Sequence, residues 1–468
     1  MSALKKAAPL IGYFLLFAPL AFIILFSYPT YDDFDLFYYM KGKWSLVEGA
    51  RVTAQFWRSW SGDWLATFGQ MVFNPLLFFS YRSLGYGIEM LILSALFFAA
   101  LIFFVYTLVG VVCGVEEKQL LHWCVLALTA PFVVGFAYFE IYCWFDGYCY
   151  GMSMSFLMMA YSFIVRYFYF ERPLDLILAT VFGCLNCVNL PTCVPLGLLY
   201  LYIWWNEPLD HGHRRIKHLT PVLLYLLVAL TNVAAPGNFA RQINGGRTIG
   251  ILKALKNAAH FCLVRGVNVL TNWPVLAGFL VILMLGIYVG YKVTSEVNHP
   301  HRFLIIMMLG IFGSIFPVSL GYVSWVMPNR IEFIYDCLFM LSTGFFLFVV
   351  GQFVGDRFKL TESPAFKAGF GAVVAAALII LVFTPQSPWT TAVFNSDTVL
   401  AQREANIAIM DQLAAEENNV DGWAVAYSSQ IPESGVYSNM GLTTDGSWPS
   451  ETIAYYFGKE NARIEWKD

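Results

Sequence analysis

Residues 86–112 read YGIEMLILSALFFAALIFFVYTLVGVV and contain a single charged side chain, Glu89. A helix needs about 20 mostly apolar residues to cross the hydrocarbon core of a bilayer, so this stretch is long enough to span a membrane. Runs of the same character recur along the 468-residue chain. The sequence therefore predicts an all-α polytopic membrane protein with about 11 transmembrane helices.

The predicted spans are separated by loops of very different length. The fifth and sixth spans are short and meet at Asn189-Leu190-Pro191, so a single broken or re-entrant element is an equal alternative there. The spans are placed near residues 9–28, 86–112, 120–138, 148–169, 174–189, 190–205, 219–235, 272–293, 303–321, 331–354 and 368–384.

The overall composition supports a membrane protein. Hydrophobic residues make up 58% of the chain and charged residues only 13%, whereas a soluble domain carries roughly 25% charged residues. This excludes a soluble enzyme, a disordered chain and a nucleic-acid-binding protein. The formal net charge of -3 gives no reason to expect a polyanionic partner.

The nine cysteines do not indicate a disulfide scaffold, because most of them lie inside apolar runs. A bridge between Cys143 and Cys149 remains open. Cys184 and Cys187 form a CxxC pair, but no second pair completes a zinc site.

Basic residues in the short loops predict the orientation. All of them fall on one side of the 11-span arrangement, so we expect a cytoplasmic N-terminus and an extracytoplasmic C-terminus. No cleavage site follows Leu25, which predicts that the first span is retained. The basic residues are Lys5, Lys6, His211, His213, Arg214, Arg215, Lys217, Arg302, Arg357, Lys359 and Lys367.

The long loops then all lie outside: residues 29–85, residues 236–271 and the tail 385–468. Residues 1–384 form the membrane domain in this interpretation. In the tail, residues 398–417 have a helical apolar pattern and residues 423–427 are typical of a strand. The tail packs on the outer loops in the simplest interpretation; binding an acceptor or closing a site are alternatives.

The first outer loop opens with three carboxylates, Asp32, Asp33 and Asp35, directly after a span. One interpretation is a solvated helix N-terminus, where Asp is common. The other is a general base or a carboxylate that positions a hydroxyl group. Further along, Arg58 and Trp60 belong to a predicted interfacial helix, so they are candidates for substrate binding or for membrane anchoring.

The second outer loop offers cationic candidates. Arg241 follows a predicted turn at Pro236-Gly237-Asn238, and Arg247 follows Gly245-Gly246. Guanidinium groups at the lipid boundary suit a phosphate group. His260 belongs to a predicted amphipathic helix over residues 249–262, whose lysines snorkel to headgroups in the simplest interpretation.

Two other outer turns add charged side chains. Arg330 either pairs with Glu332 or Asp336 or completes a cationic pocket with Arg241. Glu140 and Asp146 lie on another turn at the same face and are possible substrate-binding residues.

The whole layout resembles the GT-C superfamily of integral membrane glycosyltransferases, in particular a bacterial group of largely uncharacterised members. The resemblance depends on Asp32-Asp33 after the first span, the Ala235-Pro236-Gly237-Asn238…Arg241 segment, and the tail pattern Asp445…Trp448…Ala454-Tyr455-Tyr456-Phe457-Gly458. These motifs are moderately specific.

The resemblance implies a multi-pass protein of the bacterial cytoplasmic membrane. It implies transfer of a sugar from a polyprenyl-phosphate donor to a cell-envelope glycan or other acceptor, with inversion at the sugar carbon. Asp32 or Asp33 would be the base, and Arg241, Arg247 and Arg330 would bind the donor phosphate. No cofactor is implied; Asp33-Phe34-Asp35 is similar to the DxD pattern of metal-using members, but no second ligand cluster accompanies it.

Two other function classes compete with this interpretation. A transporter or flippase of a lipid-linked sugar or other solute needs polar side chains along a path through the bundle. A non-catalytic partner in a membrane assembly needs neither path nor site.

Overall fold

The computed structural model describes residues 2–30, 32–136, 138–206, 216–244, 249–294, 297, 300–322, 325–359, 363–384, 387–420, 423–428 and 442–466. About 80% of the structure is helical, and seven of the described helices are long and apolar enough to cross a membrane. The chain is therefore a helical, multi-pass membrane protein, as the sequence predicts. The seven helices are α1 (Ser2–Leu25), α5 (Gly85–Thr107), α8 (Tyr148–Phe170), α14 (Trp273–Lys292), α15 (Pro300–Tyr322), α16 (Asn329–Phe358) and α17 (Pro364–Phe383).

Shorter apolar helices complete the bundle. They are α6 (Lys118–Val134), α9 (Pro173–Asn186), α10 (Leu190–Asn206) and α11 (Thr220–Val233). The last of these meets α12 (Pro236–Asn244) at a bend of 40°, and the pair is an eighth candidate span if it is counted as one element. Each predicted span coincides with one of these helices, and α9 and α10 are separate.

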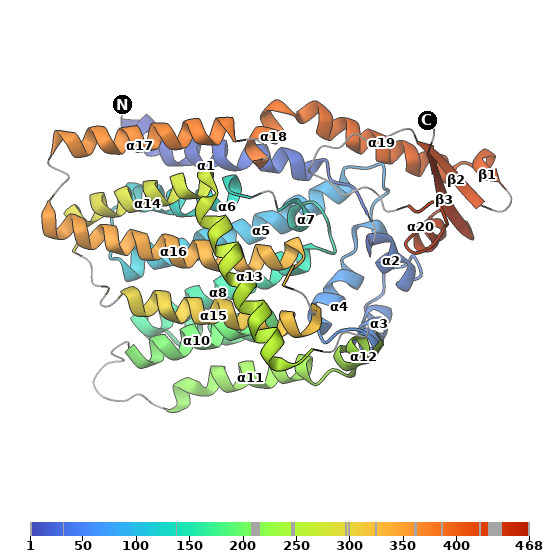
Figure 1. Cartoon of the computed structure of the whole chain (residues 1–468), viewed down its shortest axis with the longest axis horizontal. Helices are drawn as coiled ribbons and strands as arrows, with labels where there is room; N and C mark the ends of the chain where they lie inside the picture. The colour runs from blue at the N-terminus through green and yellow to red at the C-terminus, as the bar shows by residue number, and fades with distance from the viewer. Residues whose placement is uncertain are drawn as a thin grey trace.

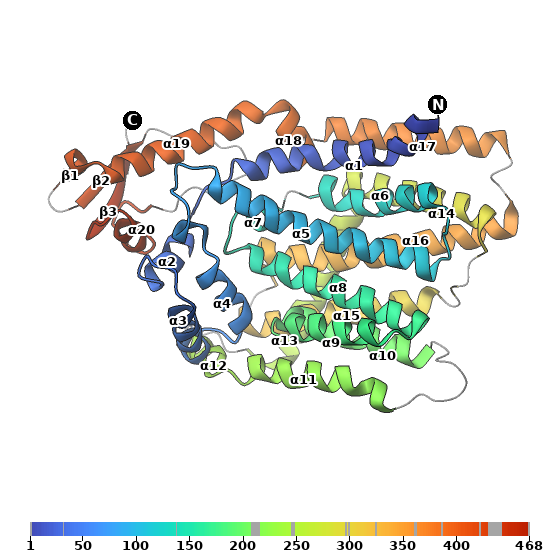
Figure 2. The same ribbon diagram turned by 180° about the vertical axis from the view of Figure 1, so that it is seen from behind.

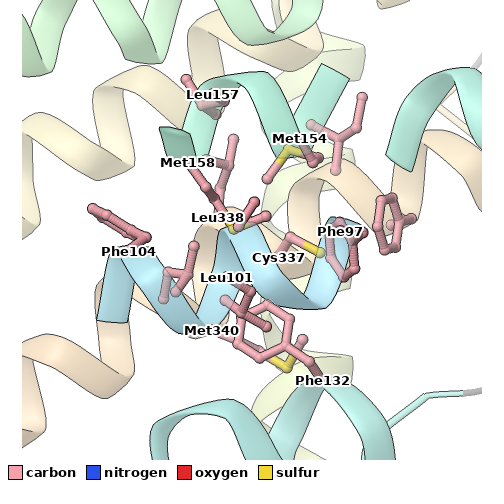
Figure 3. Packing of buried hydrophobic residues seen from close by; sticks show 14 of the residues in the cluster. Phe97, Leu101, Phe104, Phe132, Met154, Leu157, Met158, Cys337, Leu338 and Met340 are labelled. Carbon is pink, nitrogen blue, oxygen red and sulfur yellow. The ribbon is translucent and has the colours of Figure 1, made fainter. Parts of the chain in front are cut away.

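The bundle core lies where α5, α8 and α16 meet. Figure 3 shows Phe97 and Leu101 of α5 facing Met154 and Met158 of α8 across Leu338 of α16. All five side chains are at most 1% exposed. Because these positions are apolar on three helices at once, burial of large side chains holds the centre of the bundle together.

Helices α14 and α16 approach each other closely because glycines face both backbones. A Cβ at Gly290 would overlap the carbonyl oxygen of Gln352, and a Cβ at Gly355 would overlap that of Ile287. Small residues allow such close packing of membrane helices. Gln352 also donates from its side-chain amide to the carbonyl oxygens of Cys113 and Val293, at 3.1 Å each.

Helix α13 (Ile251–Thr271) lies within the predicted outer loop of residues 236–271. It is longer than the predicted helix over residues 249–262, and it crosses α14, α15 and α16 diagonally (Figure 1). Leu252 and Leu263 are 83% and 71% exposed on its outer side. The helix continues because residues 263–271 are largely apolar and because Arg265 finds acidic partners on α16.

One end of the bundle carries the loop helices and the tail, and is called the tail end below (Figures 1 and 2). The two chain termini lie at opposite ends of the molecule (Figure 1). The loop helices at the tail end are α2 (Asp32–Tyr39), α3 (Leu46–Ser59), α4 (Trp64–Val72), the short α7 (Phe139–Tyr142) and α12.

The tail combines three helices with a small sheet. Strand β2 pairs with β1 antiparallel and with β3 parallel. Phe34 of α2 and Tyr81 share a buried cluster with Met410, Ala424 and Ile453 of the tail, so the tail packs on the long loop of residues 29–85. The tail elements are α18 (Pro388–Phe394), α19 (Ser396–Ala414), α20 (Ser450–Tyr456), β1 (Asn419–Val420), β2 (Trp423–Ser428) and β3 (Asn461–Trp466).

All nine cysteines are free, so Cys143 and Cys149 form no bridge. Cys143 is buried and Cys149 is half-buried. They pack as small hydrophobic side chains.

Candidate functional site at the tail end

Asp33 is a fully buried hydrogen-bond acceptor at the start of α2. Its carboxylate accepts from the Thr30 backbone N–H at 2.9 Å, the Tyr86 hydroxyl at 2.7 Å and the Asp146 backbone N–H at 3.3 Å. Burial raises the pKa of Asp33 to about 7, although these three bonds oppose the shift. Its side chain ties α2 to α5 and to the loop before α8, which leaves it no access to a substrate.

Asp32, by contrast, is half-buried. Burial raises the pKa of its carboxyl group, and the charge of Arg330 partly offsets that shift. Asp146 lies nearby: burial and then the charges of Asp32 and Asp33 raise its pKa well above the usual range. The Gln70 amide donates to the Asp146 carboxylate at 2.6 Å. Asp32, Asp33, Asp35, Asp146 and Arg330 are called the acidic site below.

Arg330 opens α16 and supplies the positive charge of the acidic site. Its guanidinium group forms an ion pair with Glu140 at 2.8 Å and lies 5.9 Å from the ring centre of Tyr150. The predicted pairing with Glu332 or Asp336 is therefore wrong. Those two carboxylates face α13 instead, while α7 brings Glu140 to the first turn of α16.

Asp35 lies one helical turn beyond Asp32 on α2. Burial and the charge of Asp32 raise the pKa of Asp35 to about 6. The nearby Trp448 indole of the tail opposes this shift. The tail therefore contributes a side chain to the edge of the acidic site.

The predicted turn before Arg241 is instead the first turn of α12. Pro236 begins this helix, where its missing N–H costs nothing. Asn238 accepts from the Gly62 backbone N–H at 3.0 Å. A Cβ on Gly237 would lie 2.5 Å from the Trp60 backbone nitrogen, so glycine permits α12 to pack against the end of α3. The segment Pro236-Gly237-Asn238 therefore positions α12 against the end of α3.

Arg241 lies away from the acidic site among other partners. Its guanidinium group stacks 4.4 Å from the Trp60 ring centre. Its charge also acts on Asp63, whose carboxylate accepts from Asn232 at 2.5 Å and from Ser61 at 3.0 Å. Burial raises the pKa of Asp63 despite these contacts. Among the described residues, Arg241 forms neither an ion pair nor a hydrogen bond with the acidic site.

The acidic site and the group formed by Arg241 and Asp63 nevertheless lie next to each other. Asp63, near Arg241, lines a small cavity together with Met152 and Ser153 of α8, and Asp146 of the acidic site lies just before the first turn of that helix. Arg241 and the acidic site therefore belong to two adjacent groups of side chains, and the predicted cationic pocket of Arg241 and Arg330 is not formed by a direct contact between the described residues. Arg247, the third predicted phosphate ligand, lies outside the described residues.

An apolar groove of about 560 Å³ opens between α3, α4 and α11. Arg58 stands on its wall and forms no ion pair with another described residue. Trp57 and Trp64 also line it, and their indole N–H groups both donate to Thr231 of α11 at 2.9 Å. The other lining residues are Ala50, Thr53, Ala54 and Phe68.

His260 lies apart from both groups. It is exposed on α13, and its ring meets Trp325 edge to face at 4.8 Å. Among the described residues, no hydrogen bond or ion pair connects His260 to the acidic site.

A buried ion-pair cluster that the sequence analysis did not identify lies between α13 and α16. Arg265 donates from Nε to Asp336 at 2.8 Å and pairs with Glu332 at 2.6 Å. The Tyr138 hydroxyl also donates to Asp336, which is fully buried. Phe136 lies beneath the guanidinium group at 4.8 Å.

A signal for this cluster was present in the sequence. Arg265 and Asp336 are opposite charges that each stand inside an apolar run. Ionisable side chains in such runs almost always pair, so the sequence could have predicted an ion pair between Arg265 and Asp336.

The described residues include no group of three or more His, Cys, Asp or Glu side chains that could hold a metal ion. Comparisons with models of protein families, with curated proteins and with solved structures gave no significant match to this chain. The functional argument therefore depends on the site itself.

Proposed function

We propose that this chain is a membrane glycosyltransferase of the GT-C type that uses a polyprenyl-phosphate-linked sugar. The observation that carries the proposal is that half-buried Asp32 and Arg330 lie in one site at the tail end, where the charge of Arg330 lowers the pKa of the Asp32 carboxyl group against the effect of burial. A carboxylate and a guanidinium group in one site meet the two charge requirements of glycosyl transfer.

The reaction assigns one role to each group. Asp32 accepts the proton of an acceptor hydroxyl group while the oxygen of that hydroxyl group forms a bond to the anomeric carbon of the sugar. The bond from that carbon to the phosphate oxygen breaks, and the leaving polyprenyl phosphate gains negative charge. Arg330 stabilises this charge, and attack from the opposite side inverts the configuration.

Burial supports Asp32 as the base. A carboxyl group with a raised pKa holds a proton more firmly, so it is a stronger base near neutral pH than an exposed aspartate. Asp33 is the weaker candidate, because three donors already occupy its oxygens.

The apolar groove supports a lipid-linked donor. Leu227 and Leu230 on the adjacent helix α11 are 60% and 56% exposed, as expected of side chains that face lipid. A prenyl chain that entered from this side would meet the groove wall, where Arg58 offers a charge to a phosphate group. Arg241 next to Trp60 would attract the same anionic headgroup.

The membrane topology is part of the proposal. We propose that α6, α9, α10 and α11 cross the membrane with the seven long helices, as predicted from the sequence. The tail end would face the outside, with the N-terminus in the cytoplasm of a bacterial cell and a cell-envelope glycan or other molecule as acceptor. The tail would then be an extracytoplasmic region of helices and strands.

A direct test compares Asp32→Asn with the wild-type protein in nanodiscs that contain polyprenyl-phosphate-linked hexoses and a cell-envelope extract. We expect the variant to lose transfer by roughly 10²–10⁴-fold, the usual contribution of a general base. Asp356→Asn, on an exposed residue at the opposite end of the bundle, serves as the matched control. Wild-type transfer by Asp32→Asn would rule out the assignment.

A further inference from the structure

Helix α2 presents a stripe of side chains that leads away from Asp32. Asp32, Asp35 and Tyr38 are three residues apart, so they share one face of the helix. The neighbouring face carries Phe34 and Phe37, whose rings both pack on Tyr456 of the tail. The face of α2 with Phe34 and Phe37 therefore packs on the tail, whereas the stripe of Asp32, Asp35 and Tyr38 is partly exposed.

The tail adds aromatic rings to this stripe. The Trp448 indole lies near Asp35, and the Tyr455 ring meets the Tyr38 ring edge to face at 4.9 Å. All three rings are nonetheless exposed: Trp448 by 55%, Tyr38 by 45% and Tyr455 by 40%. Two segments separated by about 400 residues in the sequence thus build one aromatic surface.

The position of this surface argues against a role as a membrane anchor. Helices α2 and α20 lie beyond the ends of the long helices at the tail end (Figures 1 and 2). The carboxylates of Asp32, Asp35 and the exposed Glu451 would also repel anionic lipid headgroups.

We infer that Tyr38, Trp448 and Tyr455 form a subsite for a neutral glycan, with Asp35 as its hydrogen-bond acceptor. Sugar rings present an apolar face of C–H groups that stacks on the electron-rich face of an aromatic ring. Their hydroxyl groups donate to carboxylates. The stripe from Asp32 to Tyr38 spans roughly 9 Å along the helix, so a chain of sugar units bound here would extend to Asp32.

This inference rests on the proposed function, because it makes the subsite the place where the acceptor binds. It also makes a claim of its own, namely that the chain binds oligosaccharide without any donor. A binding measurement therefore distinguishes a failure of the subsite from a failure of the catalytic assignment.

The test is saturation-transfer NMR on the purified full-length protein with four probes: maltohexaose, cellohexaose, mannohexaose and chitohexaose. We expect at least one probe to bind and Trp448→Ala to weaken that binding roughly tenfold, as loss of an aromatic stacking partner does. Tyr455→Ala should weaken binding as well. Asp32→Asn should bind as the wild type does, even if it has lost transfer.

Trp44→Ala is the matched control, because Trp44 is 51% exposed in the loop of residues 29–85 but forms no hydrogen bond or ring contact with the described residues of the tail. Trp448→Phe keeps a ring and loses only the indole N–H, so its binding should fall between those of the wild type and Trp448→Ala. Binding of none of the four probes, or equal loss with Trp44→Ala and Trp448→Ala, would overturn the inference.

Discussion

At the scale of single residues, two adjacent aspartates have different surroundings. Asp33 is closed in by three hydrogen-bond donors, and Asp32 is half-open beside Arg330. The pattern Asp32-Asp33 gives no way to tell them apart, because helix periodicity alone does not show which side chain the tail end will cover. The difference comes from Tyr86 on α5, a contact between residues far apart in the sequence.

Replacement of Asp33 should therefore damage stability first. Asp33→Leu leaves the Tyr86 hydroxyl and two backbone N–H groups buried without their acceptor, which costs about 1–3 kcal/mol for each unsatisfied group. We expect a clear fall in the melting temperature of the protein in detergent. An unchanged melting temperature would contradict the buried, fully bonded position of Asp33, and Asp356→Leu controls for loss of a carboxylate in general.

Asp35 should make stability depend on pH. Its pKa is about 6 in the folded protein and near 3.8 without the fold, so its contribution is fully present below the lower value and is lost as pH rises through the higher one. Melting temperatures measured from pH 4.5 to 7.5 should fall with increasing pH, and Asp35→Asn should reduce that fall. A slope identical to that of the wild type would show that Asp35 does not titrate in this range.

At the scale of elements, apolar length predicts helices well and predicts their tilt poorly. All the predicted spans are helices because each is apolar over many turns. Helix α13 is longer than the predicted helix over residues 249–262, and Arg265 in the added part pairs with Asp336 of the bundle, a contact that the local pattern does not show. The turn before Arg241 was misread because Pro and Gly also begin helices and permit close packing.

The close contact between α14 and α16 can be tested at Gly290. Gly290→Val places a side chain against the Gln352 carbonyl oxygen, and overpacking of this kind typically costs about 1–3 kcal/mol. We expect a lower melting temperature and reduced yield of folded protein. Gly371→Val is the control, because a Cβ there meets nothing within 4 Å; equal effects at both positions would argue against the contact.

The ion-pair cluster can be tested with single and double replacements. Arg265→Met leaves Asp336 buried without its cation, a change that costs about 3–5 kcal/mol in comparable cases. Adding Asp336→Leu removes the stranded charge, so the double variant should regain much of the lost melting temperature. A double variant no more stable than Arg265→Met would mean that the two side chains do not interact.

At the scale of the whole molecule, the sequence predicts the helical membrane bundle and a tail packed on residues 29–85. It does not predict which arginine meets Asp32. Arg241 and Arg330 are both placed near the end of a predicted span, and only tertiary packing brings Arg330 to Glu140 while Arg241 goes to Trp60. For the same reason the aromatic surface shared by α2 and α20 is not visible in either segment alone.

The most direct test of the central claim is the rate at which purified protein releases polyprenyl phosphate from a polyprenyl-phosphate-linked sugar in the presence of acceptor extract. We expect Arg330→Gln to lower kcat by roughly 10²–10³-fold, as loss of one charge-stabilising donor does, while Arg241→Gln mainly raises KM. Melting temperatures would show that both variants are folded. Wild-type kcat in folded Arg330→Gln would contradict the claim that Asp32 and Arg330 form one catalytic site.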